Sequence, residues 1–124
     1  MQIEQGKVIC VAGVSNKPEK FGYRIFVDLL KAGFKVQGIN PADGEVAGQK
    51  IYRSLRDLPG KPNLLITVVP HQVTERLVEE AHGLGIKELW MQPGSESELA
   101  IQKAKDHGMA VTHNACFMVE MGIW

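Results

Sequence analysis

The chain has 124 residues, a common size for one domain, and its 14 basic and 14 acidic side chains cancel at neutral pH. Without a net positive charge, binding to nucleic acid or to an anionic membrane is not expected. The two cysteines show no disulfide or zinc pattern, and no apolar stretch is typical of a signal peptide or membrane span, so we expect a soluble cytoplasmic protein without a metal site.

A strand is predicted over residues 7–14, because its short and nearly continuous apolar run is typical of a buried parallel strand. Cys10 lies inside this run and is interpreted as a small core residue. The next helix is predicted to start at Pro18 or Glu19, since proline suits the first helical position and an acid suits the first turn. Gly33 follows at a position typical of a helix end.

The rest of the chain continues this alternation of strands and helices. Strands are predicted over residues 34–40, 64–69, 88–92 and 109–113, and helices over residues 71–83, 99–108 and 116–121. Weaker patterns indicate a turn over residues 42–45, a short extended piece over residues 49–52, and a helical turn over residues 54–58 capped by Ser54. About five strands joined to helices by short links predict an α/β fold, a three-layer, doubly wound, Rossmann-like parallel sheet in one domain, residues 1–124.

Five segments follow the predicted strands and should meet at one edge of the sheet, because parallel strands point the same way. They are residues 13–17, 40–41, 69–71, 92–94 and 113–114. These segments are rich in glycine, proline, amide and hydroxyl groups and poor in acids. Such a composition suits backbone and amide contacts to an anionic or amide-bearing ligand better than it suits acid–base catalysis, and the N-terminal amides of the first helix would face the same edge.

A dinucleotide is the first ligand to consider at such an edge. Its usual fingerprint is G-x-G-x-x-G, followed about 20 residues later by an acid that binds the ribose. Here Val14 and Ser15 follow Gly13, and the second strand ends in Asn40 and Pro41. NAD is therefore disfavoured, whereas an NADP site does not require the acid, and an NAD(P) enzyme stays as an alternative.

Cations near the first turn are the candidates for binding phosphate. Lys17 lies in the turn itself and is the favoured phosphate partner. Lys20 and Arg24 lie further along and are interpreted as solvated residues on the surface of the helix.

Five motifs together resemble the coenzyme A-binding domain family, which includes small single-domain proteins and is similar to the N-terminal domain of the succinyl-CoA synthetase α subunit. The motifs are VAGVSNKPEKFGYRI at residues 11–25, VQGINP at 36–41, GQKIYRSLRDLP at 48–59, PNLLITVVP at 62–70 and ELWMQPG at 88–94. They occur in the family's order and spacing and span nearly the whole chain. The resemblance does not extend to the ligase and phosphohistidine parts of the large synthetase. Near the C-terminus Cys116 and Glu120 fit the family pattern, but Phe117 stands where small members have proline.

The resemblance implies a Rossmann-like fold that holds coenzyme A along the strand ends. The matching positions are Gly13, Val14, Ser15 and Lys17, with Asn16 among them, near the nucleotide; Asn40 and Pro41 near the adenosine; Val69 and Pro70 at the third strand end; and Gln92 and Gly94 where the pantetheine arm passes. A long ligand with phosphates and two amides needs cations, amides, carbonyls and apolar walls. The composition of the strand ends agrees with this requirement.

Catalytic candidates have weaker support from the sequence. His71 is either a general base or a cap of the helix that begins there, and the cap is favoured because no Ser, Cys or carboxylate is placed beside it. His113 and Cys116 belong to one strand end and turn and are a candidate Cys–His pair, although a structural Cys116 is favoured. His82 and His107 are interpreted as surface residues.

The sequence therefore predicts a non-catalytic protein that binds coenzyme A or an acyl-CoA and serves as a carrier, a sensor or a regulatory partner of another protein. One alternative is an NAD(P)-dependent or acyl-CoA-acting enzyme that uses the same strand-end cleft, with His71 or with His113 and Cys116. Another is an interaction module with a vestigial pocket. The sequence does not indicate which acyl group would be preferred.

Overall fold

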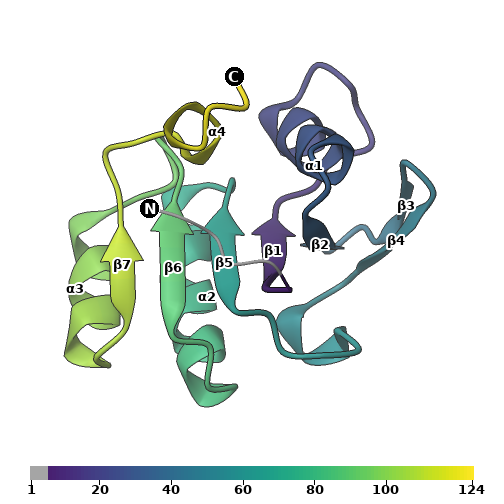
Figure 1. Ribbon diagram of the computed structural model, residues 1–124. Coiled ribbons are helices and arrows are strands. Elements are labelled where there is room, and N and C mark those ends of the chain that lie inside the picture. The colour runs from purple at the N-terminus through teal and green to yellow at the C-terminus, as the bar shows by residue number, and fades with distance from the viewer. Residues whose placement is uncertain (1–5) are drawn as a thin grey trace.

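A seven-stranded sheet forms the centre of the computed structural model, which describes residues 6–124 (Figure 1). The strands are β1 (Val8–Ala12), β2 (Lys35–Ile39), β3 (Gly44–Val46), β4 (Gln49–Tyr52), β5 (Leu64–Thr67), β6 (Glu88–Met91) and β7 (Ala110–Thr112). The helices are α1 (Phe21–Lys31), α2 (His71–Gly83), α3 (Glu98–Asp106) and α4 (Phe117–Glu120), with a 3₁₀ turn, η1, over Leu55–Asp57. Within the described residues, no helix has the length and apolar character needed to cross a membrane.

The strand order is β3-β4-β2-β1-β5-β6-β7, and neighbouring strands are parallel except for the pair β3 and β4. Strand β1 is central, with β2 on one side and β5 on the other. The chain builds the sheet outward from β1 through β2 to the β3–β4 hairpin and then returns past β1 to add β5, so the direction of building reverses at β1. In sheets of this kind ligands bind at the carboxyl ends of the strands beside the reversal. The topology therefore points to the ends of β1, β2 and β5.

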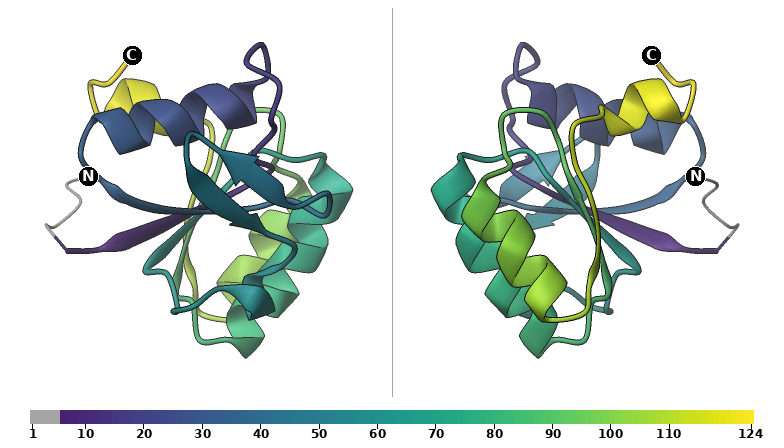
Figure 2. Two further views of the ribbon diagram at one scale, coloured as in Figure 1. Left: turned by 90° about the vertical axis from the view of Figure 1, so that its right-hand side faces the viewer. Right: turned by 90° about the vertical axis from the view of Figure 1, so that its left-hand side faces the viewer.

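Helices cover both faces of the sheet, and Figure 2 shows the sheet between them: α1 and α4 lie on one face, and α2 and α3 on the other. Side chains of β1 alternate between the two faces, as strand geometry requires. Ile9 and Val11 pack in the cluster that contains α1, whereas Cys10 and Ala12 pack in the cluster that contains α2 and α3. Burial raises the pKa of the Cys10 thiol to about 12, because an apolar environment disfavours the thiolate. The predicted core position of Cys10 is confirmed.

The doubly wound α/β fold is confirmed, and helix α2 has the predicted bounds. The five predicted strands correspond to β1, β2, β5, β6 and β7, and the extended piece over residues 49–52 is β4. The predicted turn over residues 42–45 is displaced: the turn covers Pro41 and Ala42 and is closed by the Asp43 amide, which donates to the Asn40 carbonyl at 2.8 Å, whereas Gly44–Val46 form β3 and pair with β4 in an antiparallel hairpin. The turn of this hairpin lies at Ala47 and Gly48, which both have positive φ angles of 51° and 78°.

Two further predictions of local structure differ from what is observed. Helix α1 begins at Phe21 and not at Pro18 or Glu19, which leaves Glu19 in the preceding loop. Packing of the helix against β1, described below, sets this start in place of the favourable first-turn residues. Ser54 occupies the predicted N-cap position of η1, but its side chain makes no capping hydrogen bond, because its hydroxyl donates a hydrogen bond of 3.1 Å to Asp57 Oδ2.

Candidate functional site

The carboxyl ends of β1, β2 and β5 line a pocket where the building direction of the sheet reverses. The pocket has a volume of about 150 Å³, and α2 forms its opposite wall. The predicted site residues that line it are Gly13, Asn40, Pro41 and Val69. Arg53, which follows β4, and Arg76, on α2, line it as well. We call this cavity the arginine pocket.

Gly13 and Gly22 join β1 tightly to α1 and to β5. Gly13 has a φ angle of +100°, and a Cβ atom there would overlap the carbonyl oxygen of Val68 and lie 2.8 Å from Val69 Cγ1. A Cβ atom on Gly22 would overlap the carbonyl oxygen of Gly13. The two glycines thus let the first turn of α1 pack directly on the end of β1, and this contact fixes where the helix begins.

The residues between Gly13 and α1 form a projecting loop, seen at the top of both views in Figure 2. The Lys17 amide donates to Ser15 Oγ at 3.0 Å, so the Ser15 hydroxyl stabilises the loop itself. Val14 is only 2% exposed and belongs to the core, while Asn16 and Lys17 are exposed. The predicted first-turn group is therefore divided: Gly13 lines the arginine pocket, and Lys17 lies in the projecting loop that follows it.

Asn40 connects the segments that follow β1 and β2 to the last residue of β4. Its Nδ2 donates to the carbonyl of Val14 at 2.8 Å, and its Oδ1 accepts from the amide of Ala42 at 2.8 Å. Its backbone amide donates to the carbonyl of Tyr52 at 2.8 Å. Asn40 therefore shapes the wall of the arginine pocket, and its contact with a ligand stays a prediction.

Two arginines and one acid, Glu80, line the arginine pocket, so its lining has one more basic than acidic side chain. Arg53 Nε lies 3.0 Å from Asp43 Oδ2, and both side chains are largely exposed. Arg76 is exposed on α2 and takes part in none of the ion pairs found among residues 6–124. Guanidinium groups bind phosphate oxygens by charge-assisted hydrogen bonds. The pocket is thus suited to an anionic group.

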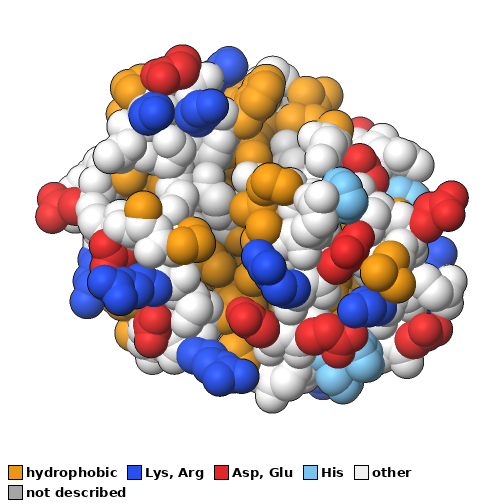
Figure 3. All heavy atoms as spheres, turned by 180° about the vertical axis from the view of Figure 1, so that it is seen from behind, with side chains coloured by type: hydrophobic (Ala, Val, Ile, Leu, Met, Phe, Trp, Pro, Cys, Tyr) orange, Lys and Arg blue, Asp and Glu red, His pale blue; other side chains and the backbone are white. Residues whose placement is uncertain are grey.

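A second pocket, of about 260 Å³, lies on the other side of the end of β5, between α1 and the segments that flank α4. It is lined by Phe21, Ile25, Val68, Gln92, Pro93, Cys116 and Trp124, and we call it the apolar pocket. Val68 lines the apolar pocket and Val69 lines the arginine pocket, so two consecutive residues separate the cavities. Figure 3 shows hydrophobic side chains in a band down the middle of the molecule, with charged side chains on both sides.

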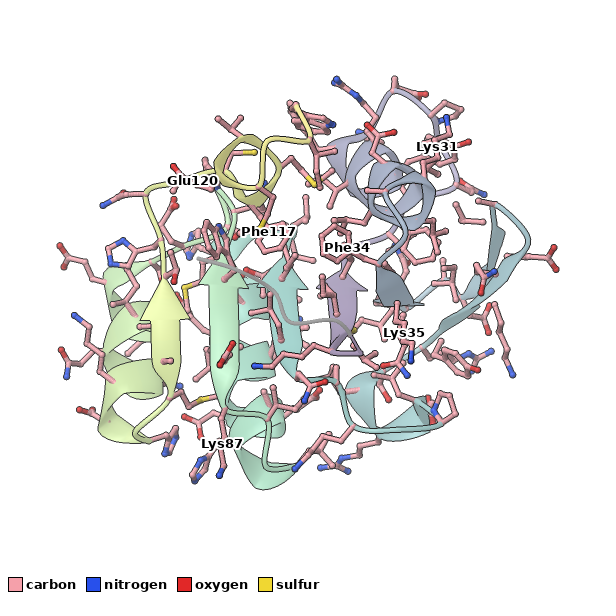
Figure 4. All side chains as sticks on the ribbon, in the orientation of Figure 1. Lys31, Phe34, Lys35, Lys87, Phe117 and Glu120 are labelled. Carbon is pink, nitrogen blue, oxygen red and sulfur yellow. The ribbon has the colours of Figure 1, made fainter. Side chains whose placement is uncertain are left out.

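Gln92 holds α4 against the sheet. Its side chain is buried; Oε1 accepts from the Phe117 amide at 2.6 Å, and Nε2 donates to Cys116 Sγ at 3.3 Å. Phe117 lies between α4 and the sheet (Figure 4), where its ring meets that of Trp90 edge-on with centroids 5.1 Å apart. Both polar ends of Gln92 are bound within the protein. The predicted contacts of Gln92 and of the exposed Pro70 and Gly94 with a ligand stay predictions.

His71 takes part in a structural contact between two helices. Its Nδ1 lies 3.3 Å from Glu75 Oε2, which also accepts a hydrogen bond of 2.7 Å from Ser97 Oγ, the N-cap of α3. The Ser97 hydroxyl, and secondarily His71, lower the pKa of the Glu75 carboxyl. The predicted capping role of His71 is wrong, because the N-cap of α2 is Pro70 and no side chain caps that helix.

The remaining histidines form no catalytic pair with a cysteine. No hydrogen bond joins His113 to Cys116 within residues 6–124, and the Cys116 thiol accepts from Gln92 instead. His82 and His107 stack with ring centroids 3.9 Å apart, far from the strand ends, at the C-terminal ends of α2 and α3. Across the described part of the chain, no three His, Cys, Asp or Glu side chains gather as metal ligands.

The sequence interpretation missed residues in both pockets. Arg53 follows β4, and counting that segment as a strand would have placed Arg53 at a strand end. Arg76 adjoins Leu77 on α2, but its position gave no sign of a ligand. No sequence pattern indicated that Trp124 lines a pocket. Its position depends on contacts with α1: its Nε1 donates to Asp28 Oδ2 at 2.7 Å, and its ring lies 4.9 Å from the Arg24 guanidinium.

The chain is similar in sequence and in fold to known proteins. A family model described as CoA binding domain matches residues 7–122. The α subunit of ADP-forming acetate–CoA ligase II from Pyrococcus furiosus is 39% identical over 80 residues, which are 64% of this chain and 18% of that subunit. A solved structure of a conserved hypothetical protein from the same organism has a TM-score of 0.88 and 39% identity, covering 92% of this chain and 98% of that one. The dinucleotide-forming acetyl-coenzyme A synthetase 1 from Ca. Korarchaeum cryptofilum has a TM-score of 0.71 and 29% identity, over 86% of this chain and 25% of its own.

Proposed function

Because this chain belongs to the CoA-binding domain family, we propose that it is a non-catalytic protein that binds coenzyme A or an acyl-CoA along the carboxyl ends of its strands. The observation that carries the proposal is the arginine pocket, where Arg53 and Arg76 line a cavity at the reversal of the sheet. A cytoplasmic role as a carrier, sensor or regulatory partner agrees with the two free thiols, because unpaired cysteines suit a reducing compartment.

The nucleotide end of coenzyme A suits the arginine pocket. This end carries a pyrophosphate and a 3′-phosphate, which match the guanidinium groups of Arg53 and Arg76. Pro41 and Val69 supply apolar surface for the adenine ring. Lys17, exposed in the projecting loop, adds a further cation for the phosphates.

The pantetheine arm suits the path from the arginine pocket over the end of β5 towards the turn after β6. Val69 and Val68 lie along this path, and Gln92 and Gly94 lie at its far end. The arm has two amides that require hydrogen-bonding partners, and the strand-end loops offer backbone groups there.

A binding role is favoured over catalysis by the partners of the candidate catalytic groups. His71 contacts Glu75, and the Cys116 thiol contacts Gln92, so neither is paired as a base with a nucleophile. The curated ligase subunit is more than five times longer than the segment it shares with this chain, and its activity is not carried over.

Titration calorimetry with coenzyme A, NAD, NADP and ATP tests the proposal. We expect coenzyme A to bind and to stabilise the folded protein by about 2.7 kcal/mol at a hundredfold excess over its dissociation constant. Lys17→Glu should weaken binding. Lys35→Glu makes the same charge change at the start of β2, away from the strand ends, and should bind as the wild type does. Binding of NADP without binding of coenzyme A would overturn the proposal.

A further inference from the structure

The polar side chains that line the apolar pocket already have partners within the protein. The Gln92 amide is bound to Phe117 and Cys116, and the Trp124 indole N–H is bound to Asp28. What the pocket offers to a ligand is the apolar surface of Phe21, Ile25, Val68, Pro93 and Trp124. A polar ligand would gain few hydrogen bonds there.

The same pocket keeps large aromatic surface in contact with water. Phe21 is 60% exposed and Trp124 is 38% exposed, and their rings lie 6.2 Å apart at the pocket mouth. Exposed apolar side chains that line one concavity are typical of a ligand site. The volume of about 260 Å³ compares with about 30 Å³ per water molecule in the liquid, so the pocket has room for several carbon atoms.

The position of the pocket identifies which part of a ligand would enter it. Val69 lines the arginine pocket and Val68, the residue before it at the end of β5, lines the apolar pocket. A coenzyme A molecule with its phosphates at Arg53 and Arg76 that crosses this strand end brings its sulfur to the apolar pocket. Whatever is attached to the sulfur then lies among the apolar side chains.

We propose that the apolar pocket binds the acyl group of an acyl-CoA whose acyl chain is short and uncharged, so that the protein prefers such thioesters to free coenzyme A. This inference rests on the proposed function. Burial of one methylene group favours binding roughly threefold to fourfold. No Lys or Arg lines the pocket, and the Arg24 guanidinium lies over the rings of Phe21 and Trp124, 5.5 Å and 4.9 Å from their centroids. A terminal carboxylate on the acyl group therefore has no partner inside the cavity.

Calorimetric titration of the whole chain with coenzyme A, acetyl-CoA, butyryl-CoA and succinyl-CoA tests this inference. Butyryl-CoA should bind on the order of tenfold more tightly than acetyl-CoA, because it buries two more methylene groups. Equal affinities, or tightest binding of succinyl-CoA, would overturn the inference and leave coenzyme A binding intact. If none of the four ligands binds, the proposed function fails with it.

Substitution of Val68 tests where the acyl group lies. Val68→Thr keeps the shape of the side chain and replaces one methyl group of the pocket wall with a hydroxyl, and it should bring the ratio of butyryl-CoA to acetyl-CoA affinity close to one. Val119→Thr is the matched control, since Val119 is 57% exposed on α4 and does not line the pocket. Phe21→Ser is a second variant, and its exposed position makes unfolding a small risk. Retention of the full ratio in both pocket variants would overturn the assignment.

Discussion

The two pockets on either side of the end of β5 are held in different ways. The arginine pocket is built from neighbouring strand ends and the helix that follows β5, and its wall is fixed by several backbone and amide hydrogen bonds around Asn40. The apolar pocket depends on Gln92, which bonds Phe117 25 residues later, and on Trp124, which bonds Asp28 across 96 residues. The arginine pocket should therefore tolerate changes near the C-terminus, whereas the apolar pocket should not.

Gly13→Ala should disrupt both pockets, because Gly13 packs where β1, β5 and α1 meet. The added Cβ would overlap the Val68 carbonyl, and the φ angle of +100° is strained for alanine. We expect a loss of about 3 kcal/mol or more in the free energy of unfolding, measured by urea denaturation.

The matched control is Gly33→Ala, with a φ angle of +90° and open space around the added Cβ. This variant has the same backbone strain without the overlap, and its free energy of unfolding should fall by about 1 kcal/mol. Equal losses in the two variants would mean that the close approach at Gly13 adds nothing.

Gln92→Leu should disturb the apolar pocket and leave the arginine pocket intact. The variant leaves the buried amide of Phe117 without its 2.6 Å hydrogen bond, which costs about 1–3 kcal/mol of unfolding free energy and loosens α4. Adenosine 3′,5′-bisphosphate, a probe for the arginine pocket alone, should bind the variant with unchanged affinity. Gln102→Leu, on the exposed side of α3, should change stability by about 0.5 kcal/mol at most. A loss of bisphosphate binding in Gln92→Leu would show that the arginine pocket depends on the apolar pocket.

Arg76→Gln should affect the arginine pocket only. Loss of one charge-assisted contact to phosphate should weaken binding of coenzyme A and of adenosine 3′,5′-bisphosphate about tenfold, or about 1.4 kcal/mol. Stability should change by about 0.5 kcal/mol at most, since Arg76 is exposed. Arg56→Gln on η1 is the control, because Arg56 does not line the pocket. Equal affinity of Arg76→Gln and Arg56→Gln for the bisphosphate would exclude Arg76 from the site.

The part of the fold that the sequence predicts well is the part in which local pattern and tertiary packing agree. Residues 64–83 illustrate this: a continuous apolar strand between prolines is followed by a helix with the predicted bounds. At residues 18–21 the local pattern and the tertiary packing disagree. Proline and glutamate favour a helix start there, but the contact between Gly22 and Gly13 moves the start to Phe21. A contact between backbones that are nine residues apart leaves no periodic signal.

The candidate site shows the same limit. Gly13, Asn40, Pro41 and Val69 could be placed together because they follow parallel strands, and the structure brings them to one pocket. The apolar pocket could not be derived in this way, because α1, α4 and Trp124 meet through side chains and not through sheet topology. Burial also changed the meaning of Gln92: a residue expected to face a ligand holds α4 in place.

The smallest expected effect concerns Glu75, which joins α2 to α3 beside the arginine pocket but lines neither cavity. The Ser97 hydroxyl and then His71 lower the pKa of its carboxyl below the ordinary value of 4.5, so the folded state favours the carboxylate. The resulting stability is present above that value and is lost as the pH falls through the lowered pKa of the folded state. The difference in unfolding free energy between the wild type and Glu75→Gln should therefore be constant from neutral pH to about pH 5 and shrink in more acidic solution. Glu98→Gln, a substitution in the first turn of α3 measured in parallel, corrects for the loss of one carboxylate.

A difference in unfolding free energy that stays constant down to pH values where wild-type carboxyls are protonated would mean that the hydrogen bond from Ser97 does not favour the ionised form. Because the carboxyl is reached by water, the effect should be smaller than that of any substitution at the two pockets.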